Sequence, residues 1–179
     1  ALGIVLGYFK EQINMTIQYY AQQLEAINYK ALWVGQNVME KIDGISPYTA
    51  FIRPIPELHS VAEIIGHLVA LNIDIINKFK THFNLQQVYQ PEHWRSNEEL
   101  KTIGWKQLKE DYEKSILSII VLIGDKDDSL LEKTYTEENH KSVYPFEFAL
   151  EGVIHHAMYH LGQIGIIIKL LINKELHIS

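Results

Sequence analysis

The stretch HHAMYHLGQ at residues 155–163 lies near the middle of a long apolar segment. Pro145 stands at the start of this segment, and because Pro is favoured at the first position of a helix we predict a helix over residues 144–172. His156 and His160 are four residues apart, so on a helix they lie one above the other on one face. The last helix is therefore expected to carry two stacked imidazoles in otherwise apolar surroundings.

Three other long segments have apolar residues at steps of three and four, which is typical of amphipathic helices: residues 8–27, 60–83 and 96–123. A shorter helix is predicted over residues 34–42. Residues 129–143 are expected to form a helical turn followed by a loop or small hairpin. Two S-x-x-E capping boxes predict where the second and third long helices begin: Ser60 with Glu63, and Ser96 with Glu99.

This pattern predicts an all-α fold, because alternation typical of strands is nearly absent. Long helices with one apolar stripe bury the stripes by packing side by side, and a four-helix bundle is the usual arrangement. The connections are long enough to allow a crossover. A length of 179 residues suits one domain, and no repeat or linker divides the chain, so a single domain over residues 1–179 is expected.

Composition argues against several classes of protein. The net charge is -6 and no basic cluster stands out, so nucleic-acid binding is not expected. The chain has no cysteine, which removes disulfides and thiolate ligands and is consistent with a cytoplasmic protein. The strongest apolar run, residues 161–172, is shorter than the ~20 residues that cross a bilayer, so no membrane association is expected.

Burial of His156 and His160 side by side is costly unless both rings are satisfied, and a metal ion satisfies both through neutral ring nitrogens. The alternative is a pair on a partly exposed helix face. His67 lies inside the predicted helix over residues 60–83, which a bundle could place beside the last helix. Three nitrogen ligands leave coordination positions open, as in catalytic sites. Taken by itself, His67 could also be a hydrogen-bonded core residue.

The remaining candidates have simpler explanations. His155 lies about 100° around the helix from His156 and is expected at the rim of the site or behind the ligands. Ala157 stands where the zinc-protease motif H-E-x-x-H has its catalytic Glu, which excludes that class. No catalytic residue is evident. Glu63, one turn before His67, is a candidate for such a role or for supporting a ligand, but helix capping is the favoured explanation of this residue. The other histidines are expected to be structural or on the surface: His59, His82, His93, His140 and His177.

Three pieces of this sequence resemble the DinB/YfiT-like superfamily of metal-dependent enzymes. Trp33 and Gly35 are followed by RPIPELHSVAEIIGHL at residues 53–68, and GVIHHAMYHLGQI occupies residues 152–164. Between them lies an aromatic-rich helix around Trp105. The resemblance covers about residues 30–172 and does not extend to residues 1–14.

The resemblance implies an up-down-down-up four-helix bundle with a three-histidine site at one end of a pocket, and His67, His156 and His160 match the three ligand positions. It implies zinc or nickel as the metal, with water in the open positions, and it implies that a homodimer is common. Relatives with known chemistry are thiol-dependent transferases and an isomerase, and many others are classed as hydrolases.

We therefore expect a metal-dependent enzyme that acts on a small molecule. The metal would activate either water for hydrolysis or a low-molecular-weight thiol for transfer. Because the chain has no cysteine, such a thiol has to come from solution. The alternative is a non-catalytic stress-response or ligand-binding bundle whose metal is structural or vestigial, and the lack of an obvious general base favours it.

Overall fold

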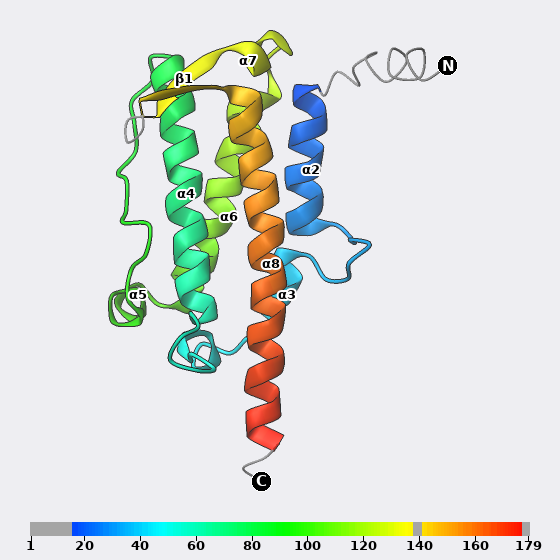
Figure 1. The fold of residues 1–179 in the computed structure, drawn as a ribbon, viewed down its shortest axis with the longest axis vertical. Coiled ribbons are helices and arrows are strands. Elements are labelled where there is room, and N and C mark those ends of the chain that lie inside the picture. The colour runs from blue at the N-terminus through cyan, green and yellow to red at the C-terminus, as the bar shows by residue number, and fades with distance from the viewer. Residues whose placement is uncertain (1–15, 138–140, 177–179) are drawn as a thin grey trace.

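The structure is a computed structural model that describes residues 16–137 and 141–176. Four long helices lie side by side (Figure 1): α2 (Ile17–Tyr29), α4 (Val61–His82), α6 (Trp105–Gly124) and α8 (Phe146–Leu176). In Figure 1, α2 and α8 run in one direction and α4 and α6 in the other. The predicted all-α, up-down-down-up bundle is confirmed. The part of the first predicted helix before residue 16 lies outside the described residues.

A long crossover joins α4 to α6, because these neighbours run in the same direction and the chain must return between them. Residues 83–104 make this return and include the short helix α5 (Asn97–Ile103). The predicted helix over residues 96–123 is wrong in one respect, since Gly104 divides it into α5 and α6. Gly104 has φ +86° and ψ 149°, a conformation that is essentially restricted to glycine.

The segment before the last helix forms the expected turn and hairpin: α7 (Ser129–Glu132), β1 (Thr134–Glu137) and β2 (Ser142–Pro145). Pro145 pairs with Thr134 at the end of the hairpin, where a missing N–H is tolerated. The last helix therefore begins at Phe146, one residue after the proline, and not at residue 144 as predicted. It also continues beyond the predicted end, to Leu176.

Side-chain caps determine where the helices begin. The short predicted helix is observed as α3 (Val38–Asp43), four residues late, because Asn37 caps it and Val34 is exposed in the preceding turn. A 3-10 turn, η1 (Thr49–Phe51), follows α3. Both predicted capping boxes form, at the starts of α4 and α5: Ser60 with Glu63, and Ser96 with Glu99.

Two apolar clusters fill the bundle. One extends toward α3 and α5 and contains Leu68 and Leu161, the neighbours in sequence of two of the candidate ligands. The other lies toward the hairpin, where Phe79 of α4 stacks on Phe146 of α8 with ring centroids 4.5 Å apart. These clusters hold α4 and α8 in a defined register. None of the described helices is both long enough and apolar enough to cross a membrane.

Candidate metal centre

The structure brings His67 of α4 together with His156 and His160 of α8. One ring nitrogen from each of these three residues lies within 4.8 Å of the other two. The His156 Nε2 atom is 3.3 Å from the His67 Nε2 atom and 2.8 Å from the His160 Nε2 atom. Tetrahedral zinc with normal Zn–N bonds places its ligand nitrogens roughly 3.3 Å apart. The His67–His156 distance matches this spacing, and the His156–His160 distance is about half an ångström shorter, so a bound ion would require a small separation of these two rings.

Two of the rings form a hydrogen bond to an oxygen atom through the nitrogen that faces away from the cluster. His67 Nδ1 donates to the main-chain carbonyl of His93 at 2.9 Å, and His160 Nδ1 donates to the Gln163 side-chain oxygen at 2.6 Å. Because a carbonyl oxygen only accepts, both rings carry their proton on Nδ1 and direct an Nε2 lone pair into the site. A proton on His156 Nε2 could satisfy only one of these lone pairs, whereas a metal ion engages all three nitrogens.

Burial keeps these imidazoles neutral. Loss of hydration lowers the pKa of His67 to about 4 and that of His160 to about 4. The same desolvation also lowers the pKa of His156. Neutral imidazole is the form that binds a metal, so the three rings are in their ligand state at pH 7 without an energetic cost of deprotonation.

The crossover contributes a second support to His67. The Trp94 ring stacks on the His67 ring with centroids 3.8 Å apart and planes 9° apart, and Trp94 also stacks on His59 at 4.0 Å. Sequence reasoning missed the roles of His93, Trp94 and Gln163 here. Gln163 had a usable signal, since it lies three residues after His160 on an apolar helix, but a main-chain carbonyl such as that of His93 leaves no signature in sequence.

Glu63 is buried at the start of α4. Its carboxylate accepts from the Ser60 N–H at 2.8 Å and from Arg53 Nε at 2.9 Å, and Arg53 supplies a second contact through its terminal nitrogen. Burial alone would raise the pKa of Glu63, but the hydrogen bonds from Arg53 and Ser60 outweigh it and lower that pKa. Glu63 is thus an ionised capping group, and its role as a general base stays a prediction. His155 is exposed, as expected for a rim position.

A cavity of about 380 Å³ adjoins the histidine cluster at His156. His93 and His156 form its wall on the metal side, and apolar residues of α4 and α8 form most of the rest: Leu71, Ile75, Phe148, Ala149 and Val153. At the other end, Lys78 is paired with Asp74 at 2.5 Å and with Glu137 of the hairpin at 2.7 Å. The cavity is therefore lined by a candidate metal ligand, by apolar side chains and by a cluster of paired charges.

Comparison with models of known protein families identifies the family of this chain. Residues 30–164 match the family model of the DinB superfamily. The chain belongs to the DinB superfamily. The match contains α3 to α6, the hairpin and the part of α8 that carries His156 and His160, and it confirms the resemblance seen in the sequence. Among curated proteins, none matches the chain.

Two solved structures share the DinB superfamily fold seen here. A conserved protein from Enterococcus faecalis is 15% identical with a TM-score of 0.56, and the match covers 88% of this chain and 93% of that one. The colibactin self-resistance protein ClbS, solved in complex with a double-stranded DNA, is 12% identical with a TM-score of 0.55, covering 88% of this chain and 98% of that one. At these identities the similarity shows the fold alone.

Proposed function

We propose that this protein is a metal-dependent enzyme whose divalent ion is held by His67, His156 and His160. The observation that carries the proposal is the convergence of three neutral Nε2 atoms at the wall of an apolar cavity. Three nitrogen ligands leave coordination positions open, which distinguishes a catalytic site from a closed structural one. The substrate is a small molecule, because the adjoining cavity of about 380 Å³ is of the size that such ligands occupy.

Zinc or nickel is the ion that this donor set suits, since imidazole is a favoured ligand of both. When bound, the ion supplies Lewis acidity and lowers the pKa of water or of a thiol. The protein's own groups do the remaining work. His93 and Gln163 hold the Nδ1 protons of two ligand rings, and Trp94 covers one face of His67.

Hydrolysis and thiol transfer both suit this site. The chain has no cysteine, so in the transfer reaction a low-molecular-weight thiol enters from solution as cosubstrate. Glu63 is engaged by Arg53 and Ser60, and we assign it to positioning the start of α4 rather than to proton transfer. Cobalt substitution followed by thiol titration separates the two reactions. A sulfur-to-metal charge-transfer band supports transfer, and a spectral response to azide without a response to thiol supports hydrolysis.

A non-catalytic bundle with a structural or vestigial metal is the second candidate. In the described parts of the chain, no carboxylate hydrogen-bonds to any of the three imidazoles, so no carboxylate in contact with the ligands is placed to act as an acid or base. A protein of this kind would bind metal without an accessible coordination position. Exogenous thiol and azide would then both leave the cobalt spectrum unchanged, whereas a catalytic site would respond to at least one of them.

Metal analysis of untagged protein tests the site itself. We expect about one ion per chain, and His156→Ala and His160→Ala each abolish its retention because two nitrogens no longer hold the ion. His155→Ala is the matched control, since His155 is the exposed neighbour on the same helix and should leave the metal content unchanged. Equal metal content in all four proteins would contradict the assignment of the ligands.

The proposal also covers the protein's location, its oligomeric state and its relation to nucleic acid. We place the protein in the cytoplasm as a homodimer that does not bind nucleic acid. The dsDNA in the ClbS structure is a property of that protein, and a net charge of -6 opposes phosphate contacts in this one. Fluorescence anisotropy with labelled double-stranded DNA at low salt checks this point, because electrostatic binding is strongest there. Saturable binding would overturn this part of the proposal.

A further inference from the structure

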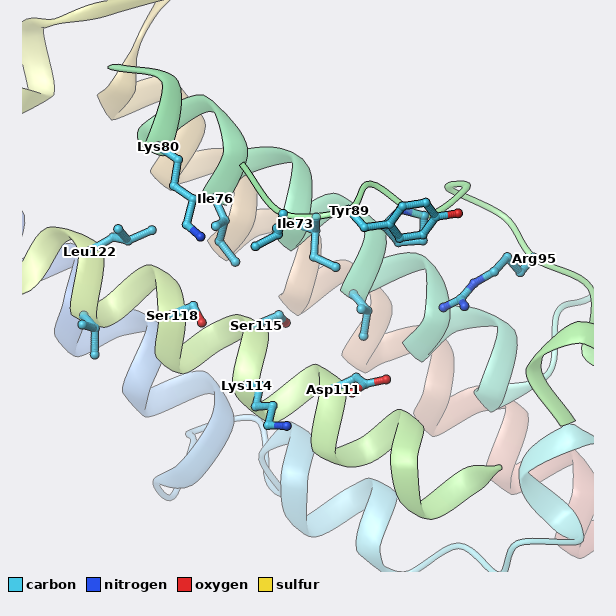
Figure 2. Close-up of a pocket in the computed structure, with 14 residues that line it drawn as sticks. Ile73, Ile76, Lys80, Tyr89, Arg95, Asp111, Lys114, Ser115, Ser118 and Leu122 are labelled. Atoms are coloured by element: carbon cyan, nitrogen blue, oxygen red, sulfur yellow. The ribbon is translucent and has the colours of Figure 1, made fainter. Parts of the chain in front are cut away.

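A second cavity, separate from the metal centre, lies between α4, α6 and residues 88–95 of the crossover (Figure 2). We call it the α4–α6 groove. Its volume is about 550 Å³, within the range of small-molecule sites. Residues 88–95 form one edge of the groove, so helices and crossover together give it three sides.

The groove is on the face of α4 that points away from the metal. Each residue turns a helix by about 100°, so positions 67 and 69 are about 200° apart. Val69, Ile73 and Ile76 line the groove, whereas His67 binds at the metal centre and Leu71 lines the cavity beside it. A ligand in the groove is therefore separated from the proposed metal chemistry by the thickness of α4.

Most of the groove wall is apolar and partly open to water. Tyr89 is 85% exposed and Val121 is 74% exposed, and both border the groove. Val69 and Ile76 form a buried floor beneath them. A ligand whose hydrocarbon covers these apolar side chains gains binding free energy, because the contact removes apolar surface from water.

The charges of the groove are unbalanced toward the positive. Arg95, Lys80 and Lys114 line it against a single acid, Asp111, whose carboxylate already accepts from Gln107 at 2.9 Å. None of the three cations forms an ion pair within the described part of the chain. Figure 2 shows Arg95 and Lys80 toward opposite ends of the groove, with Lys114 on the α6 side.

Arg95 has a hydrogen-bond donor that no acceptor among the described residues satisfies. Its Nε atom is buried and has no hydrogen-bond acceptor. A guanidinium presents Nε and a terminal nitrogen as a fork that matches the two oxygens of a carboxylate. A buried donor without an acceptor is costly. Because Arg95 lines the groove, a small movement of its side chain that turns Nε toward a carboxylate in the groove would remove that cost.

We propose that the α4–α6 groove binds an elongated apolar monocarboxylate, with its carboxylate on Arg95 and its hydrocarbon chain along Ile73, Ile76 and Val121. Lys114 and Lys80 add attraction for the negative charge. A neutral alcohol of the same shape offers Arg95 one uncharged acceptor in place of two charged oxygens, so it binds more weakly, and a cationic ligand is repelled. The inference does not depend on the reaction at the metal centre.

Isothermal titration calorimetry with octanoate, octan-1-ol and octylammonium tests the charge preference, with each ligand below its micelle-forming concentration. The expected result is one octanoate per chain, bound at least tenfold more tightly than octan-1-ol, with octylammonium weaker still. Equal affinities for octanoate and octan-1-ol would overturn the proposal, because the binding would then be hydrophobic only.

Variants locate the binding. Arg95→Gln should bring octanoate to within about twofold of octan-1-ol, and Ser118→Trp should block both, since exposed Ser118 lines the groove. Lys106→Gln removes a charge from the same helix outside the groove and should change nothing. If Ser118→Trp does not fold by circular dichroism, Arg95→Gln decides alone, and unchanged octanoate binding there would overturn the proposal.

The metal centre is the competing place for a carboxylate. His156→Ala removes a metal ligand but leaves the groove intact, so octanoate should bind this variant as it binds the native protein. Loss of binding in His156→Ala would place the carboxylate at the metal and would overturn the proposal.

Discussion

Gln163 determines the orientation of the His160 ring, because its side-chain oxygen accepts the Nδ1 proton at 2.6 Å. Residues that hold a ligand imidazole in this way tune its basicity and direction, and their loss typically lowers metal affinity by 10–100-fold. We predict a loss of about that size for Gln163→Ala, measured by competition with a chromogenic chelator. Gln22→Ala, at an exposed position of α2, is the control and should bind metal normally. Native affinity in Gln163→Ala would show that His160 needs no support.

Because of Glu63, the free energy of unfolding is expected to depend on pH in the acidic range. Its pKa is lowered in the folded protein because hydrogen bonds from Arg53 and Ser60 outweigh the effect of burial. A depressed carboxyl pKa stabilises the folded state above the unfolded pKa, and this contribution is lost as pH falls through the folded value. Glu63→Gln should therefore lower the free energy of unfolding by about 1–3 kcal/mol at pH 7 and by much less at pH 3.

Urea denaturation at the two pH values measures this difference. Glu99→Gln is the matched control, because Glu99 has the same capping-box position at the start of α5 but is exposed, and Arg95 acts on it only through charge, without the hydrogen bonds that Arg53 gives Glu63. Its effect on unfolding should be smaller. An equal loss at pH 7 and pH 3 in Glu63→Gln would mean that packing, and not charge, explains the role of Glu63.

At the scale of elements, the crossover is the part of the site that sequence could not predict. Periodicity identified α4 and α8, and their register brings His67 beside His156 and His160 as expected. The support to His67 comes from residues 93 and 94 in a loop, where no periodic pattern exists. A main-chain carbonyl is offered by every residue, so its use is decided by the path of the crossover and not by residue type.

The break between α5 and α6 could not be predicted from the sequence either, because the backbone conformation that causes it leaves the apolar pattern unchanged. Leu100 and Leu108 are both fully buried, so the apolar pattern continues across Gly104 although the helix does not. The positive φ of Gly104 changes the direction of the backbone between α5 and α6, while both leucines stay in the core. Periodicity reports which side chains are buried, but it does not report the backbone conformation that joins them.

Gly104→Ala should destabilise the protein by about 1–3 kcal/mol, because a side chain is strained at φ +86° and ψ 149°. The added Cβ meets no other atom, so the expected loss comes from backbone strain alone. Gly124→Ala is the control: it lies at the end of α6, where φ is not positive and a Cβ also meets nothing. Thermal unfolding compares the two, and equal melting temperatures would contradict the strain argument.

At the scale of the whole molecule, α8 has more apolar surface than the bundle covers. Residues 152–168 contain no Asp, Glu, Lys or Arg. One face of α8 packs in the core, yet Phe148 is 52%, Tyr159 62% and Ile166 58% exposed on another. A helix that is apolar on all sides is normally buried on all sides. Gly162, also exposed between Tyr159 and Ile166, leaves room for another helix to approach closely.

A second copy of the chain supplies such a helix, and this is how we expect the proposed homodimer to form. In a two-fold dimer each α8 residue meets the same surface of its mate, so one substitution acts twice. Tyr159→Glu combined with Ile166→Glu should convert the dimer to a monomer, because it places four like charges in an apolar interface. Light scattering coupled to size-exclusion chromatography measures the mass. Leu117→Glu, which charges a partly exposed apolar position of α6, should remain dimeric. A native protein that is already monomeric, or a double variant that stays dimeric, would place the interface elsewhere or remove it.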